Sequence, residues 1–114
     1  MLPGRAAGGA PADGRESMPL FHGKYRGRVV DNVDPTQLGR IKVLVPAVDG
    51  AATNWALPCM PYADPQTGFL FVPLIGALVW IEFEASDPNY PIWSGCFWER
   101  VEDMPTVVMP TPAK

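Results

Sequence analysis

The sequence has few of the residues that carry most catalytic and metal chemistry. It contains 2 cysteines and 1 histidine among 114 residues. Cys59 and Cys96 stand far apart, a spacing that defines neither a disulfide framework nor a metal site. His22 has no second imidazole and no nucleophile motif to work with, so we interpret it as a surface residue. A glycine-rich phosphate loop and a serine elbow are also missing, and we therefore expect no enzymatic activity, no cofactor and no metal.

Charged residues are scarce as well. They make up 18% of the chain against 47% hydrophobic residues, and the formal net charge is -3. This composition excludes wholesale disorder and indicates apolar surface that either the core or a partner covers. A negative net charge does not favour a polyphosphate partner, so we expect no nucleic acid to bind.

Long uninterrupted hydrophobic runs are absent from the sequence. The longest apolar run, residues 69–83, is broken by Pro73, Gly76 and Glu82, so we expect no stable membrane insertion. The first residues lack the basic start, apolar core and cleavage site of a secretory signal, and we expect a soluble protein made in the cytoplasm. The length predicts one domain with its own core.

The strongest pattern in the sequence is a pair of alternating segments within residues 24–46. The residues on one face of the two segments are Tyr25, Gly27, Val29 and Val33, followed by Ile41, Val43 and Val45. We predict that the segments pair as strands and that this face is buried. A glycine inside a strand, as at Gly27, indicates a bulge, a sharp bend or a close backbone neighbour.

The two predicted strands are joined by a turn whose residues are chemically suited to it. The carboxylate of Asp34 can accept backbone N–H bonds, and Pro35 presets its own φ. Gly39 permits a positive φ before Arg40. A leucine at a turn tip is better covered than left in water, so we expect Leu38 to lie under the end of the fold.

Shorter segments with strand character follow. Two prolines make residues 54–62 an edge strand or an extended loop, whereas residues 69–73 predict a short apolar strand. Residues 77–84 alternate clearly, and residues 92–98 form an aromatic strand with a central glycine. The residues predicted to face inward from 77–84 are Ala77, Val79, Ile81 and Phe83.

Short strands, turns rich in glycine and proline and the lack of any helical period predict an all-β fold. A small five-stranded OB-like barrel with extended N- and C-terminal arms fits the length, with SH3-like barrels and sandwiches as alternatives. We expect a flexible N-terminal arm at residues 1–20, the OB-fold barrel at 21–100 and an extended C-terminal tail at 101–114.

Two groups of charged residues raise other functions. Glu82 and Glu84 share a strand face, which suggests a small carboxylate hydrolase, but nothing nearby desolvates either carboxyl group and we interpret them as solvated. The paired arms would also form a cationic strip of Lys24, Arg26, Arg28, Arg40 and Lys42. Tyr25, Trp55 and Phe71 could lie beside this strip. An alternative function is therefore that of an OB module that binds single-stranded nucleic acid or an oligosaccharide. The strip could instead meet an acidic partner or pair with the two glutamates.

The segment from Gly27 to Pro46, with its D-P-x-x-L-G-R turn, resembles the OB domain of central spike and baseplate assembly V proteins. These proteins belong to contractile phage tails, type VI secretion systems and extracellular contractile injection systems. The likeness covers roughly residues 22–98. The residues that carry the motif are Asp34, Pro35, Leu38, Gly39, Arg40, Pro73, Gly76, Asp87, Pro91 and Gly95.

The resemblance implies an OB barrel that assembles as a homotrimer on the tail axis of a phage virion or an injection particle. Its partners would be a baseplate hub protein and, through the C-terminal tail, a spike or tip protein. No catalytic residues carry over from this domain. Because the sequence stops soon after the barrel, without a lysozyme-like domain or a β-helical needle, we expect an adaptor between hub and tip.

Aromatic residues are too numerous for one small barrel to bury all of them. We therefore expect some rings at subunit contacts, with Trp80 and Trp93 as the preferred pair. The candidate interface residues are Trp55, Phe69, Phe71, Trp80, Trp93, Phe97 and Trp98.

Overall fold

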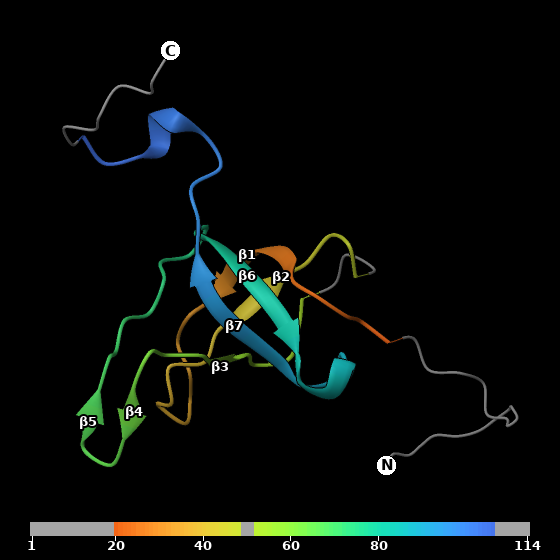
Figure 1. Cartoon of the computed structure of the whole chain (residues 1–114), viewed down its shortest axis with the longest axis vertical. Coiled ribbons are helices and arrows are strands. Elements are labelled where there is room, and N and C mark those ends of the chain that lie inside the picture. The colour runs from red at the N-terminus through yellow and green to blue at the C-terminus, as the bar shows by residue number, and fades with distance from the viewer. Residues whose placement is uncertain (1–19, 49–51, 107–114) are drawn as a thin grey trace, which may run out of the picture.

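A computed structural model describes residues 20–48 and 52–106, and these contain strands and 3-10 turns but no α-helix (Figure 1). The strands of the main sheet are β1 (Tyr25–Asp31), β2 (Lys42–Leu44), β3 (Leu57–Pro58), β6 (Leu78–Phe83) and β7 (Pro91–Cys96). A separate hairpin is formed by β4 (Ala63–Asp64) and β5 (Thr67–Gly68). The 3-10 turns are η1 (Glu84–Ser86) and η2 (Val101–Asp103).

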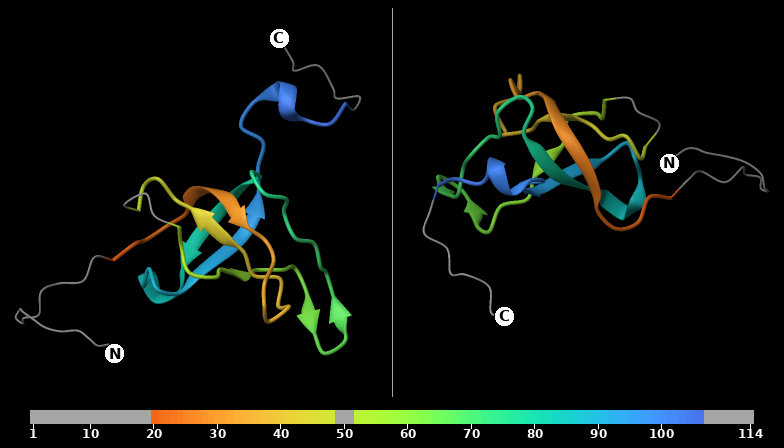
Figure 2. Two further views of the ribbon diagram at one scale, coloured as in Figure 1. Left: turned by 180° about the vertical axis from the view of Figure 1, so that it is seen from behind. Right: turned by 90° about the horizontal axis from the view of Figure 1, so that it is seen from above.

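The main sheet curls into a small barrel. Its strand order is β2-β1-β6-β7-β3, and every pair is antiparallel except β3 with β7. Two isolated bridges, Ile41 with Ala56 and Leu44 with Ala52, connect the β2 edge to the segment before β3 (Figure 2). The predicted all-β, OB-like fold is confirmed. The predicted edge character of residues 54–62 is also confirmed, because β3 is the last strand of the sheet.

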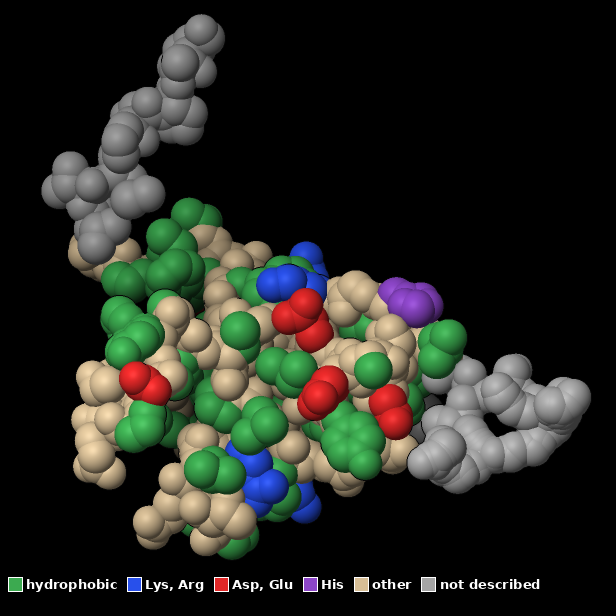
Figure 3. Space-filling view, turned by 60° about the horizontal axis from the view of Figure 1, so that its bottom comes forward, with side chains coloured by type: hydrophobic (Ala, Val, Ile, Leu, Met, Phe, Trp, Pro, Cys, Tyr) green, Lys and Arg blue, Asp and Glu red, His purple; other side chains and the backbone are tan. Residues whose placement is uncertain are grey.

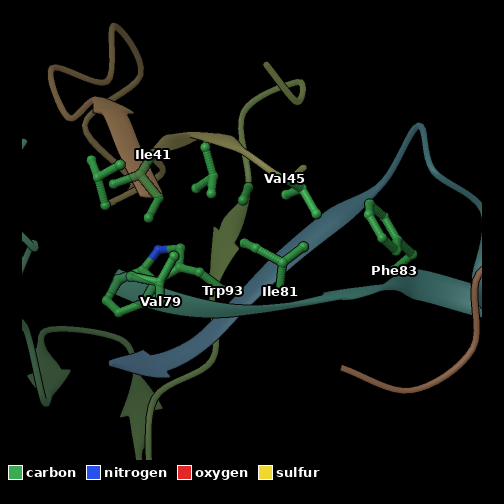
Figure 4. Close-up of a cluster of buried hydrophobic side chains, with 9 residues drawn as sticks. Ile41, Val45, Val79, Ile81, Phe83 and Trp93 are labelled. Atoms are coloured by element: carbon green, nitrogen blue, oxygen red, sulfur yellow. The ribbon is translucent and has the colours of Figure 1, made fainter. Parts of the chain in front are cut away.

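The core forms where the inward faces of the strands meet (Figure 4). Alternation places one side chain in two inside, as the patterns of β1, β2 and β6 predict. The buried residues are Val29, Ile41, Val43, Val45, Ala56, Val79, Ile81, Phe83 and Trp93. The indole Nε1 of Trp93 donates a hydrogen bond to the carbonyl oxygen of Gly39 at 3.1 Å, so its polar atom is satisfied inside the barrel.

Gly27 marks a close approach of two strands, as predicted. A Cβ atom at this position would collide with the Cγ1 of Val43 and lie 3.3 Å from the Cγ2 of Val45. The missing side chain therefore lets β1 and β2 cross closely above the core. The register shift of this pair lies further along, between Val29 and Asp31.

Several local predictions are wrong, and the reasons are physical. Val33 is 76% exposed because β1 ends at Asp31 and the alternation ends with it. Leu38 is 58% exposed, because the barrel end is already covered by another part of the chain. The tail predicted to be extended starts with η2 instead; residues 107–114 and most of the N-terminal arm lie outside the described residues.

The segment that covers the barrel end is a long excursion between β3 and β6, which we call the apolar limb (residues 61–75). It runs out through the β4–β5 hairpin, in green in Figure 1, and returns without pairing to another strand, so the strand predicted at 69–73 does not form. The ring of Phe71 packs edge-on against Trp93 with centroids 5.6 Å apart. Asn32 Nδ2 donates to the carbonyl oxygen of Pro73 at 3.0 Å, which fixes the returning end.

Candidate functional site

The turn between β1 and β2 is organised by a single carboxylate. Asp34 accepts the backbone N–H groups of Thr36 and Leu38, each at 2.9 Å, and that of Arg40 at 3.1 Å. The Arg40 guanidinium adds a contact of 2.9 Å from Nη2. The adjacent glycine, Gly39, has a φ of 79°. The predicted roles of the aspartate and the glycine are confirmed.

Electrostatics explains why an aspartate suits this turn. The Arg40 guanidinium, followed by the three backbone donors, holds the pKa of Asp34 well below its usual range, and the aspartate in turn raises the pKa of Arg40. The Asp34 side chain is only 3% exposed, so its charge depends on these partners. The turn therefore has a structural role, because its charges are matched internally.

The remaining motif residues shape the other turns. Gly76 has a φ of 91° and its carbonyl oxygen accepts a bond from Arg28 Nη1 at 2.8 Å. Asp87 accepts the backbone N–H of Asn89 at 2.9 Å, which closes the turn before β7. Gly95 has a φ of 138° beside the register shift between β6 and β7, the bulge that a central glycine indicates. All three residues therefore fix the conformation of the backbone in their turns.

The outer face of the barrel carries a stack of aromatic and charged side chains. The rings of Trp80 and Phe97 lie 4.5 Å apart, and the Arg26 guanidinium sits 5.2 Å from the Phe97 centroid and 5.6 Å from the Trp80 centroid. Arg26 also contacts Glu99 at 3.7 Å. Trp80 thus faces away from the core, as predicted, and both rings remain half-buried and partly accessible.

Trp93 is a correction to the predicted interface. Its side chain is fully buried in the chain's own core, so it has no surface to offer to a second subunit. Trp93 pairs with the buried Ile81 of β6 and shares its inward face, and the register shift of this strand pair lies beyond it, between Val79 and Ile81. Trp98, by contrast, lies beyond β7 and is 58% exposed.

The apolar limb is the largest concentration of uncovered apolar side chains near the barrel. Its exposed large residues are Tyr62, Phe69, Leu70, Phe71, Val72, Leu74 and Ile75. Figure 3 shows hydrophobic side chains open to solvent at many points of one face, with charged side chains between them. Contiguous exposed apolar segments of this kind mark contact sites with other macromolecules. Phe69 and Phe71, two predicted interface residues, belong to the limb.

Most side chains of the predicted cationic strip make contacts within the chain. Arg28 caps Gly76, Arg40 is held by Asp34, and Arg26 lies over two rings beside Glu99. Lys42 Nζ lies 5.2 Å from the centroid of the Trp55 ring. These internal contacts reduce what the strip can offer to a polyanion, which needs several uncommitted cations in a row.

The described part of the chain offers little for metal chemistry. No group of three or more histidine, cysteine, aspartate or glutamate residues that could hold a metal ion is found in it. Cys59 and Cys96 are both exposed free thiols, and partial burial raises the pKa of Cys96. Within the same residues, no helix is long and apolar enough to cross a membrane.

Comparison with sequence profiles of protein families matches residues 25–98 to the type VI secretion system/phage-baseplate injector OB domain. The chain belongs to this family. A search of curated proteins finds no match. The matched region begins with β1 and ends just after β7, so the injector OB domain coincides with the barrel and the apolar limb.

The most conspicuous surface of the injector OB domain was not predicted from the sequence. A strand was expected at residues 69–73, which join no sheet, because an apolar run gives no information on whether a partner strand is available. Two signals could have indicated the excursion: Pro61 and Pro73 bound it, and the segment Asp64-Pro65-Gln66-Thr67-Gly68 is a hairpin turn. The role of Asn32 as an anchor gave no signal in the sequence.

Proposed function

We propose that this injector OB domain forms a homotrimeric, non-enzymatic adaptor on the tail axis, linking a baseplate hub to a spike or tip protein. The family supports a baseplate or injector setting. A barrel whose charged turn is matched internally supports a structural role, because its specific residues act on its own backbone. In this proposal the domain recognises its partner proteins through exposed apolar side chains rather than through charged residues.

The apolar limb is the observation that carries this proposal. Leu70 and Leu74 are 77% and 76% exposed, although each lies within a few residues of side chains that pack on the barrel. A cyclic trimer uses two different surfaces on each subunit, because every copy contacts the next one head to tail. We assign the limb to one of these two surfaces, and the outer-face pair Trp80 and Phe97 to the other.

The spike or tip protein is assigned to the end where the C-terminal segment leaves the barrel. A hollow of about 640 Å³ lies there, lined in part by Ala77, Leu78 and Trp98 and bordered by Arg100. Arg100 bonds Asp103 at 3.2 Å, which holds the turn η2 next to the hollow. An apolar floor with a charged rim is the usual composition of a protein contact site.

Cosedimentation tests the proposal directly. An epitope-tagged copy would be expressed in the native cell, and tail-like particles would be purified and quantified against the hub and the tube. We expect about one copy per hub chain, since the trimer matches a trimeric hub. A copy carrying Leu70→Asp and Leu74→Asp should be absent from the particles while remaining folded. Absence of the unmodified protein from intact particles would contradict the adaptor function.

A further inference from the structure

The returning half of the apolar limb presents an unpaired backbone edge. Residues 69–73 belong to neither sheet, and Figure 2 shows the run from β5 to β6 as an extended trace. Among the described residues, the backbone of this run makes one backbone hydrogen bond, from the N–H of Phe69 to the carbonyl oxygen of Tyr62 at 2.9 Å. The N–H and C=O groups of Leu70 and Val72 have no backbone partner in the part of the chain that the structure describes.

The bond of Phe69 shows which edge of the run is free. Its acceptor directly precedes β4, and the backbone groups of successive residues in an extended strand point to opposite edges, so those of Leu70 and Val72 point away from β4. Pro73, which has no N–H, falls on the same side as Phe69, and its carbonyl oxygen accepts the bond from Asn32. The free edge therefore keeps a donor and an acceptor at each of two residues, as an incoming strand requires.

The run is held against the barrel, so this edge is already formed. The ring of Phe71 packs on the buried Trp93, with 5.6 Å between the two centroids, and the bond to Pro73 fixes the returning end. Leu70 and Val72 nevertheless remain exposed. A partner strand gains main-chain hydrogen bonds here and covers apolar side chains without having to order the run first.

The sequence of the C-terminal tail matches this edge in length and in character. The segment Thr106-Val107-Val108-Met109 lies between two prolines, and three of its four residues are β-branched. The limb run Phe69-Leu70-Phe71-Val72 is also four residues long and ends at Pro73. Because proline cannot donate to a ladder, the two segments offer strands of the same length. Thr106 is exposed, and the residues after it lie outside the described ones.

The next subunit of the proposed ring is the partner that brings the two segments together. In that ring the limb of one subunit meets the outer-face pair Trp80 and Phe97 of its neighbour. The C-terminal segment begins directly after Phe97 and passes through η2 to Thr106. Figure 1 shows η2 carrying the chain out beyond the barrel, at the end away from the β4–β5 hairpin. The tail therefore starts at the surface that faces the neighbour's limb.

We propose that residues 106–109 of one subunit add as a strand to the free edge of Leu70 and Val72 in the next subunit. The inference rests on the proposed homotrimer and names the backbone contact that closes it. Each subunit gives one strand and receives one, which is the arrangement of a closed head-to-tail ring. The tip protein keeps the hollow beside η2 as its contact.

Photo-cross-linking of the full-length chain tests this pairing. Phe69 is replaced by the photoreactive residue benzoylphenylalanine, a change of one exposed aromatic ring for another. Ordinary and 15N-labelled chains are mixed, allowed to exchange, irradiated and digested. We expect Phe69 to be linked to the peptide of residues 101–114 in pairs that combine one light and one heavy chain. Sedimentation velocity on the same sample reports separately whether the trimer forms.

Prolines in the tail test the strand itself. Val107→Pro/Val108→Pro removes a donor from each edge of the tail segment, and we expect the cross-link to fall about tenfold or more. Amide exchange of Leu70 and Val72 should become about tenfold faster in this variant, since no strand then covers their N–H groups. The matched control, Thr111→Pro/Ala113→Pro, adds the same number of prolines after the segment and should change neither readout. Both variants leave residues 25–98, the matched family region, intact.

Four outcomes would overturn the inference, and they separate it from the proposed function. A trimer without cross-links to residues 101–114 refutes the strand addition and leaves the homotrimer standing. Cross-links confined to chains of one isotope show that the tail closes on its own subunit. Cross-links that survive Val107→Pro/Val108→Pro show a contact that needs no strand. A monomer without cross-links removes the homotrimer and the strand addition together.

Discussion

The barrel and the apolar limb treat hydrophobic side chains in opposite ways. In the barrel, alternation sends valines and isoleucines such as Val43 and Ile81 into a core where they have no exposed area. In the limb, Leu70 and Leu74 remain largely in water although the sequence around them is as apolar. The difference lies in the partner: barrel strands pair with each other, whereas none of the described residues forms a second layer over the limb. A substitution should therefore affect folding in the barrel and assembly in the limb.

Loss of the central indole should have the largest effect. Trp93→Ala removes the largest buried side chain and leaves Gly39 without its donor, and we expect a loss of about 3–5 kcal/mol in the free energy of unfolding. Urea denaturation at fixed protein concentration measures it. The matched control, Trp98→Ala, removes the same kind of ring from the surface and should change the stability by less than about 0.5 kcal/mol. Equal losses would refute the assignment of Trp93 to the core.

The close crossing of β1 and β2 comes next. Gly27→Ala places a methyl group against the Cγ1 of Val43, and overpacking of this kind costs about 1–3 kcal/mol. The double variant Gly27→Ala/Val43→Ala makes room for the added methyl group. We expect the two losses to be strongly non-additive, with part of the Gly27→Ala cost recovered. If thermal denaturation shows that the losses of the two single variants simply add, the close crossing is not the cause of the Gly27→Ala destabilisation.

The aspartate of the β1–β2 turn should give a smaller, pH-dependent effect. Because the pKa of Asp34 is lowered in the folded chain, its contribution to stability is complete above about pH 4, the value of an unfolded aspartate. This contribution is lost as the pH falls below that value. Asp34→Asn should lower the thermal midpoint at pH 7 and flatten the decline in acid. Asp64→Asn, at an exposed aspartate of the limb, should leave both unchanged.

Changes in the limb should have the smallest effect on folding. Leu70→Ser together with Leu74→Ser should alter the free energy of unfolding of the isolated subunit by less than about 0.5 kcal/mol, since both side chains are already in water. Sedimentation velocity should nevertheless show the proposed trimer shifting to monomer. Val33→Ser is the matched control, an exposed residue outside the limb. A trimer that survives the double change would remove the limb from the interface.

The sequence was informative wherever local chemistry determines local structure. Alternation identified the buried residues of β2 and β6, and the aspartate and glycine of the first turn were predicted with their roles. It failed where the outcome depends on distant segments. The burial of Trp93 depends on its pairing with the inward-facing Ile81 of β6, and the unpaired state of residues 69–73 depends on which strands close the barrel.

The anchoring of the limb by Asn32 and Arg28 also defines a path for mechanical load. Arg28 lies in β1 and Asn32 directly follows it, and β1 is hydrogen-bonded on both sides, to β2 and to β6. A pull on the returning end of the limb therefore passes through two side chains into a strand that is supported on both edges. Antiparallel pairs loaded along their length share the force over many hydrogen bonds. The apolar limb is thereby tied to a strand that shares load with a neighbour on each side.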